Sequence, residues 1–256
     1  MKKSVKAIIA AAAASFMCAV PTVSSVSNVP TINSISASAS YTPNLWEDFD
    51  DNLIPEVTNV SDLTKKINLC HVDYTINTKN KTATIMGIDN ADSRIKIPAQ
   101  IKVNGVLYKI TKITDNAFKD KDGVTKENGR LKMGAPLTKI DLTAAKYLED
   151  IGTNAFMNCK QLKSIEIPGY ITKIEANAFA NAGLTEVTFS RKNGGYALTI
   201  ESGAFSGCSS LSTAYVNRLM ASDSDKTAFS GCNSDLRKHI IGDYAYTSIF
   251  KRIFFK

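Results

Sequence analysis

The dipeptide Ala-Phe recurs along the chain, and this repetition constrains the fold more than any other feature of the sequence. Its copies end at Phe118, Phe156, Phe179, Phe205 and Phe229, with a weaker sixth copy at Ala245-Tyr246. Between Phe156 and Phe229 the steps are 23, 26 and 24 residues, so the underlying period is about 23 residues. A period in this range is typical of stacked coils, each of which buries its apolar face only against its neighbours.

Other residue types keep a fixed distance from these aromatic residues. Five positions before five of the six lies an aliphatic residue: Ile113, Ile151, Ile174, Ile200 and Ile241. Three positions after comes a small residue, which is Cys159, Ala182, Cys208 or Cys232. A leucine follows, namely Leu162, Leu184, Leu211 or Leu236. Pairs of alternating apolar residues then complete the coils: Ile95 and Ile97, Ile140 and Leu142, Ile165 and Ile167, Val187 and Phe189, Ala214 and Val216.

This pattern predicts coils that each hold one short strand and then turn through a helical or irregular arc carrying Ala-Phe. Stacked coils would pair their strands in parallel, about 4.8 Å apart, and bury one continuous apolar column. Irregular spacing falls between core positions, with an insertion over roughly Lys119–Pro136 and a longer turn at 191–195. Insertions confined to turns leave the core positions in register.

The string IGTNAFMNCKQLKSIEIP, from Ile151 to Pro168, closely resembles the repeat of BspA-like leucine-rich-repeat proteins, a family of bacterial secreted and surface proteins. The resemblance covers roughly residues 71–246. Residues 73–76 and 83–88, joined by a turn at 79–81, resemble the β-hairpin that opens the family's repeat domain. The resemblance implies an α/β solenoid: a short right-handed leucine-rich-repeat array of about five coils with parallel strands and an N-terminal β-hairpin cap. It also implies adhesion to matrix proteins, other cells or surface glycans.

The first 39 residues are typical of a secretory signal peptide. Lys2, Lys3 and Lys6 precede an apolar run at 7–20 that is short for a membrane span. Small residues at 37–39 predict cleavage before Ser40, and a cut near residue 19 is the alternative. Cys18 does not predict lipidation, because a bulky methionine precedes it. We therefore expect a secreted, extracellular protein, with association to the cell surface as an alternative.

The remaining chain divides into three parts. Residues 40–70 form a linker or N-terminal segment, which contains the single tryptophan, Trp46, and a short helix expected near 60–67 with Ser61 as its cap. Residues 71–246 form the leucine-rich-repeat domain. Residues 247–256 form a basic amphipathic tail, with Ile249, Phe250, Ile253 and Phe254 at helical spacing, which either caps the last coil or contacts a membrane.

Composition argues against several classes of function. Removing three leader lysines leaves 28 basic and 24 acidic residues, which is too mild an excess for a nucleic-acid-binding stripe. The two histidines, His71 and His239, lie at opposite ends of the array and cannot converge on one site. No nucleophile elbow, His-Glu-x-x-His or phosphate loop occurs, and a pair such as Asp141 and Glu166 is typical of a solvated solenoid face. We therefore expect no enzymatic activity and no cofactor.

Two further groups of residues are candidate sites. Asp120-Lys-Asp122-Gly123 is similar to the middle of a calcium loop, but the first ligand position would fall on Phe118, so no metal is expected. Cys159, Cys208 and Cys232 occupy one slot in different coils, which indicates small buried side chains. A bridge between Cys208 and Cys232 remains an alternative, whereas no partner can be named for Cys70.

Strand alternation predicts a contact surface. If Ile165 and Ile167 point inward, the residues between and beside them point outward. The outward set is Arg94, Lys96, Lys139, Asp141, Ser164, Glu166, Glu186, Thr188, Thr213 and Tyr215. Such a face suits an extracellular protein or glycan, and it is also what a solvated sheet without a ligand presents. The leading hypothesis is an adhesin-like interaction module; the alternatives are a structural spacer or a membrane-associating protein acting through the tail.

Overall fold

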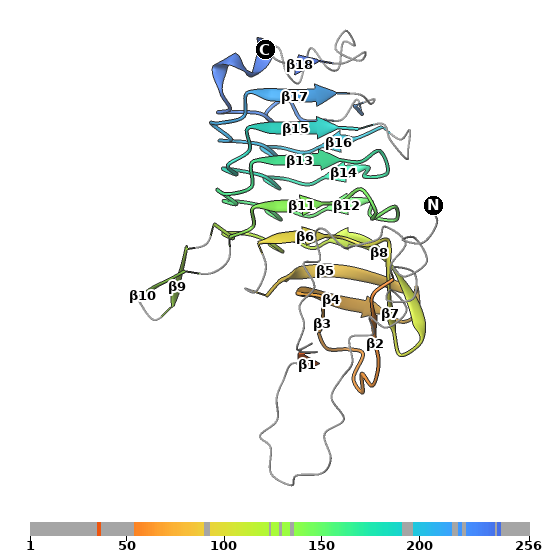
Figure 1. Ribbon diagram of the computed structural model, residues 1–256. Helices are drawn as coiled ribbons and strands as arrows, with labels where there is room; N and C mark the ends of the chain where they lie inside the picture. The colour runs from red at the N-terminus through yellow and green to blue at the C-terminus, as the bar shows by residue number, and fades with distance from the viewer. Residues whose placement is uncertain are drawn as a thin grey trace, which may run out of the picture.

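The computed structural model describes residues 35–36, 54–89, 93–122, 124–127, 130–133, 136–190, 197–216, 220–221, 224–238 and 240–241. Short strands stack into one upright column, which the chain climbs from its N-terminal strands to β18 (Figure 1). Within these ranges the only helical element is a 3-10 helix, η2 (Ser234–Lys238), and no α-helix occurs. The solenoid is therefore built from strands and turns, and the helical part of the predicted α/β class is wrong for this portion of the chain.

The predicted strand of each coil belongs to what we call the front ladder. It comprises β6 (Arg94–Lys96), β11 (Lys139–Asp141), β13 (Ser164–Ile167), β15 (Glu186–Phe189), β17 (Thr213–Val216) and β18 (Ile240–Ile241). β11 pairs with β6, and β13, β15, β17 and β18 pair in that order, always in parallel. Ile165 and Ile167 are buried, whereas Ser164 and Glu166 are not. The predicted parallel pairing and the period-two alternation are thus confirmed.

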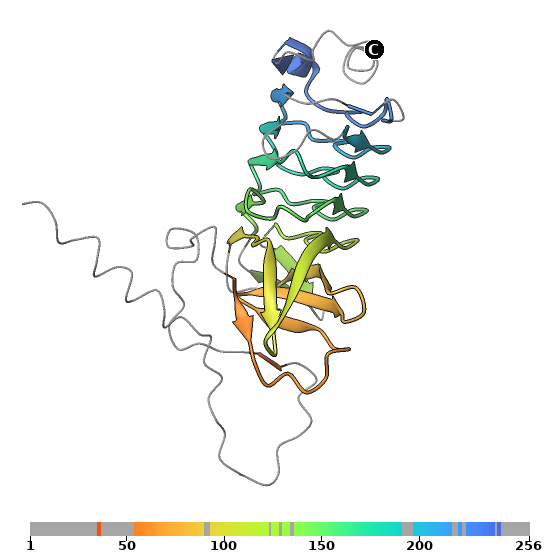
Figure 2. The ribbon, with the colours of Figure 1, turned by 90° about the vertical axis from the view of Figure 1, so that its right-hand side faces the viewer.

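A second set of parallel strands, the back ladder, runs up another side of the column (Figure 2). It comprises β8 (Val106–Ile113), β12 (Asp150–Ile151), β14 (Lys173–Ile174) and β16 (Thr199–Ile200). Each strand ends on the buried isoleucine five positions before a repeat phenylalanine. Ile241 departs from this alignment, because it pairs with Tyr215 in the front ladder. In the coil of Phe229 the corresponding position is Ser224, whose hydroxyl oxygen accepts a hydrogen bond from the Ile200 amide over 3.1 Å.

The Ala-Phe arcs form the third side of each coil, and their rings lie in single file. Centroids are 4.8 to 5.0 Å apart and the rings are stacked from Phe118 through Phe156, Phe179 and Phe205 to Phe229. Four phenylalanine amides donate to the alanine carbonyl of the next coil, those of Phe118, Phe156, Phe179 and Phe205, with N–O distances of 2.6 to 2.7 Å. Backbones approach closely here, which explains why the residue before phenylalanine is always the small alanine.

The N-terminal strands form one sheet with the back ladder. The hairpin of β4 (Val72–Asn77) and β5 (Thr82–Ile88) is antiparallel, as expected, and β5 pairs in parallel with β8. Around it lie β1 (Ile35–Ser36), β2 (Glu56–Val57), β3 (Ile67–Leu69) and β7 (Gln100–Val103). β1 pairs with β3 although it lies within the predicted leader, so the mature chain would retain it only after the earlier cut.

The short helix predicted near 60–67 is wrong. The backbone of Val60 exchanges two hydrogen bonds with the Asn104 side chain, over 2.7 and 3.0 Å. The Thr64 amide donates to the Asp62 carboxylate instead of entering a helical ladder. This stretch therefore forms bends and turns against the turn between β7 and β8.

The insertion near 119–136 carries a hairpin of its own. β9 (Val124–Glu127) and β10 (Arg130–Met133) pair antiparallel and stand out from the column (Figure 1). Ala245-Tyr246, the tail at 247–256 and most of the leader lie outside the described residues.

Candidate functional site

The ten predicted contact residues lie on the outer face of the front ladder. Parallel register aligns Arg94 with Lys139, and Lys96 with Asp141. Higher up, two files of side chains run across β13, β15 and β17: Ser164, Glu186 and Thr213 in one, and Glu166, Thr188 and Tyr215 in the other. All ten are exposed or half-buried, while their strand neighbours are buried. The structure thus brings the predicted residues together on one face; their role in binding remains a prediction.

Charge changes along this face. Its lower part is mainly basic, with Arg94, Lys96 and Lys139, and its upper part carries carboxylates and hydroxyls. The Asp141 carboxylate already has hydrogen-bond partners, since it accepts hydrogen bonds from the amide and the hydroxyl of Thr143 over 2.8 and 2.6 Å.

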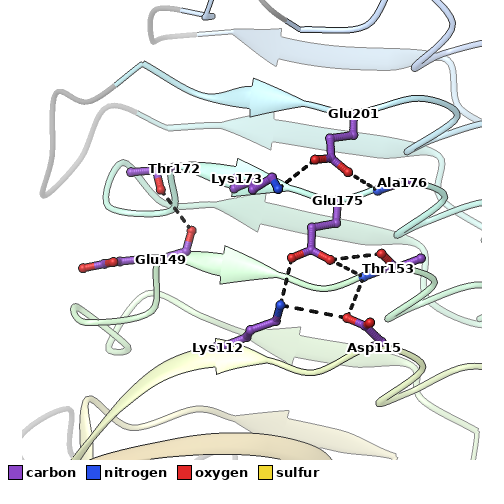
Figure 3. Close-up of polar contacts among 9 residues, drawn as sticks. All are labelled: Lys112, Asp115, Glu149, Thr153, Thr172, Lys173, Glu175, Ala176 and Glu201. Carbon is purple, nitrogen blue, oxygen red and sulfur yellow. Dashed lines mark hydrogen bonds and ion pairs between the residues drawn. The ribbon is translucent and has the colours of Figure 1, made fainter. Parts of the chain in front are cut away.

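The back ladder carries a polar network that joins successive coils (Figure 3). The Lys112 ammonium lies 2.8 Å from the Glu175 carboxylate, whose other oxygen accepts bonds from the amide and hydroxyl of Thr153 over 3.1 and 3.0 Å. One coil further up, Glu201 repeats the arrangement with the Lys173 ammonium at 2.8 Å and the Ala176 amide at 3.0 Å. Each glutamate therefore satisfies an amide of the coil below and holds a lysine.

These contacts shift the ionisation of the network. Burial alone would raise the pKa of Glu175, but hydrogen bonds from Lys112 and Thr153 and the charges of Lys112 and Lys173 outweigh it, so the pKa lies below its ordinary value. The hydrogen bond to Glu175 raises the pKa of Lys112. Burial raises the pKa of Asp150, which lies between the two lysines in the ladder. The lysines and glutamates of this network are paired with one another. We therefore interpret the network as structural and call it the back-ladder staple.

Comparison with known proteins agrees with this architecture. The sequence profile described as "BspA type Leucine rich repeat region" matches residues 132–256 in six copies. Residues 132–256 therefore form a BspA-type leucine-rich-repeat region. No curated protein shows significant similarity to it.

Several solved structures are similar to this chain. A leucine-rich repeat protein from Bacteroides capillosus ATCC 29799 is 21% identical, with a TM-score of 0.45; the match covers 59% of this chain and 98% of that one. For the T. pallidum leucine-rich repeat protein the identity is 15%, the TM-score 0.41 and the coverage 73% and 94%. A leucine-rich repeat protein from Bacteroides ovatus ATCC 8483 is 18% identical, with a TM-score of 0.36; the match covers 69% of this chain and 55% of that one.

The repeat cysteines are packing residues. Cys159, Cys208 and Cys232 each direct the thiol to the phenylalanine carbonyl of the coil below, over 3.0 to 3.2 Å. Burial raises the pKa of the Cys159 and Cys208 thiols to about 12, so both stay protonated and able to donate at neutral pH. All three are free thiols, and the bridge considered between Cys208 and Cys232 is not formed.

The other candidate residues lie apart from the front face. His71 contacts the Asp89 carboxylate at 3.0 Å near the hairpin, and His239 falls outside the described residues. Asp120 accepts a bond from the Asn158 side chain over 2.6 Å. Across the ranges that the structure describes, no three His, Cys, Asp or Glu residues gather as metal ligands, and no helix is long and apolar enough to cross a membrane.

Sequence reasoning missed the back-ladder staple. A signal was present, because Glu175 and Glu201 each directly follow a repeat isoleucine, Ile174 and Ile200. The position alone does not predict the partner, since Lys112 is 63 residues from Glu175 in sequence.

Replacing Glu175 by glutamine should lower the free energy of unfolding by about 1 to 2 kcal/mol, because a charged hydrogen bond to a lysine that is one-third exposed is lost. The pH dependence follows from the two shifts. The depressed Glu175 pKa gives stability that is complete at neutral pH and is lost as pH falls through the folded value, below 4.5. The raised Lys112 pKa gives stability that is lost as pH rises beyond 10.5.

Urea unfolding of wild type and Glu175→Gln from pH 3 to 8 tests this. The difference between them should shrink toward low pH. The exposed Glu149, whose side chain points away from Glu175 in Figure 3, provides a matched control as Glu149→Gln. A constant difference across pH, or an equal loss in the control, would contradict the assignment.

Proposed function

We propose that this protein acts outside the cell, secreted or associated with the cell surface, as an adhesin-like interaction module without enzymatic activity. It binds a protein or glycan through the outer face of the front ladder. The observation that carries this proposal is the ordered array of ten polar side chains, held in parallel register on a rigid apolar column. Stacked coils are suited to this role because successive strands offer an extended surface with little loss of conformational freedom on binding.

The basic lower part and the carboxylate-rich upper part of the face support contact with a polar partner. The back ladder is a poorer candidate, because its charged groups are already engaged with one another. The cap role of the β4–β5 hairpin belongs to this proposal too, since the hairpin lies at the end of the column away from the last repeats.

Purified residues 40–256 should bind one or more members of a panel of matrix proteins and glycans. Joint replacement of Lys96, Asp141, Glu166 and Tyr215 by alanine should abolish that binding, measured by surface plasmon resonance. The control is Lys79→Ala with Glu149→Ala, two exposed residues away from the face. Thermal unfolding must show that both variants remain folded, since Asp141 also closes a turn. Binding that persists unchanged in the fourfold variant would refute the proposed surface.

A further inference from the structure

We infer that the upper part of the front face, on β13, β15 and β17, docks an extended polypeptide segment that presents arginine side chains. This inference rests on the proposed function and names the class of partner. The docking face consists of six residues: Ser164, Glu166, Glu186, Thr188, Thr213 and Tyr215.

The first argument is the state of the carboxylates. In the described part of the chain, the Glu166 and Glu186 carboxylates make no hydrogen bond or ion pair, whereas Glu175, Glu201 and Asp141 are all engaged. Both side chains are half-buried on the sheet rather than fully solvated. Carboxylates with open acceptor sites gain from a cationic partner that donates hydrogen bonds to them.

The second argument is their placement. Glu166 is in register with Thr188, and Glu186 with Ser164, so the two glutamates lie diagonally on adjacent strands. Sheet geometry separates such positions by about 8 Å, from a strand spacing of about 4.8 Å and a same-face step of about 6.7 Å. An extended peptide presents alternate side chains on one face about 6.7 Å apart. Two arginines on that face can therefore each reach one of the two carboxylates.

The third argument distinguishes arginine from lysine. Tyr215 follows Thr188 in the file of Glu166 and is diagonal to Glu186. A guanidinium can donate in a fork to a carboxylate and also stack on an aromatic ring, whereas an ammonium is a compact, strongly hydrated charge. The hydroxyls of Ser164 and Thr213 flank Glu186 in its file and can accept from the remaining N–H groups.

Charge favours a peptide over a neutral glycan. The whole chain carries a net charge of +7, so a basic partner is not drawn by overall attraction but by this local section of the face. A neutral glycan would satisfy hydrogen bonds yet leave both carboxylates uncompensated.

The test uses the full chain and a synthetic peptide that alternates arginine and serine. Matched peptides replace arginine by lysine or by citrulline, which keeps the shape and removes the charge. Fluorescence anisotropy should show the arginine peptide binding tightest, with affinity falling as salt rises. Replacing Glu166 and Glu186 together by glutamine should weaken binding about tenfold, from two surface charge pairs, and Tyr215→Leu should weaken arginine more than lysine. Glu149→Gln should leave affinity unchanged.

Equal affinity for the arginine and citrulline peptides, or no loss in the double glutamine variant, would overturn the inference. If the fourfold variant of the previous subsection loses a matrix protein or glycan while the arginine peptide fails to bind wild type, the inference fails and the proposed function stands. If no panel member binds either, both fail.

Discussion

Replacing Phe179 by alanine should lower the free energy of unfolding by about 3 to 5 kcal/mol, the range for deleting a buried ring from a close-packed core. Phe179 is fully buried, and its ring lies 4.8 Å from that of Phe156 and 5.0 Å from that of Phe205. The cavity would lie in the middle of a column whose backbones are tied together by hydrogen bonds on three sides. The neighbouring coils therefore have little freedom to collapse into the vacated space.

The same substitution at Phe229 provides the control. That ring stacks on Phe205 at 4.8 Å and meets Phe189 edge-on at 6.4 Å, but it is only partly buried in the last described arc. We expect Phe229→Ala to cost about half as much, since less surface was removed from water. Urea unfolding followed by circular dichroism measures both. Equal losses at the two positions would show that the file of rings does not act as a continuous core.

The core positions could be predicted from sequence because each depends on a repeated spacing. Phe156, Phe179 and Phe205 recur with the same neighbours, and stacking is the one arrangement that buries all copies alike. The back ladder could not be predicted in this way. Strands such as Asp150–Ile151 hold two residues, which are too few to show an alternating pattern.

The conformation of the arcs has a signal in the sequence. Asparagine or glycine stands two positions before and two after most repeat phenylalanines, as in Asn154 and Asn158 around Phe156. These residues have positive φ, 55° and 62°, which asparagine tolerates better than other non-glycine residues. An arc of this kind therefore holds two residues in the left-handed backbone region, and it takes the irregular form rather than the helical one.

The sequence predicts which residues of the candidate face point outward. It does not predict which of their carboxylates already have hydrogen-bond partners. Alternation alone places Asp141, Glu166 and Glu186 outside. Whether a carboxylate is already bound depends on local turns and on coils distant in sequence. Asp141 is held by Thr143 two residues later, and Glu175 by Lys112 from two coils earlier. Only the folded arrangement separates the open carboxylates from the engaged ones.

Gly183→Ala should be at least as damaging as loss of a core ring, with a cost of about 3 kcal/mol or more. A Cβ at Gly183 would lie 1.8 Å from the Lys160 carbonyl oxygen and 2.6 Å from its carbonyl carbon. These are backbone atoms, so no side chain can rotate away. The Gly183 amide also donates to the Cys159 carbonyl over 3.0 Å, and moving the chain apart would break that bond.

Gly105→Ala separates this steric effect from the general cost of replacing glycine. Gly105 lies in the turn between β7 and β8 with φ +80°, and an added Cβ would meet nothing within 4 Å. Its replacement should cost about 1 kcal/mol, from the left-handed backbone alone. In thermal unfolding, the midpoint temperature of Gly183→Ala should therefore lie well below that of Gly105→Ala. A Gly183→Ala protein as stable as Gly105→Ala would mean that adjacent coils do not approach as closely as the stacked column requires.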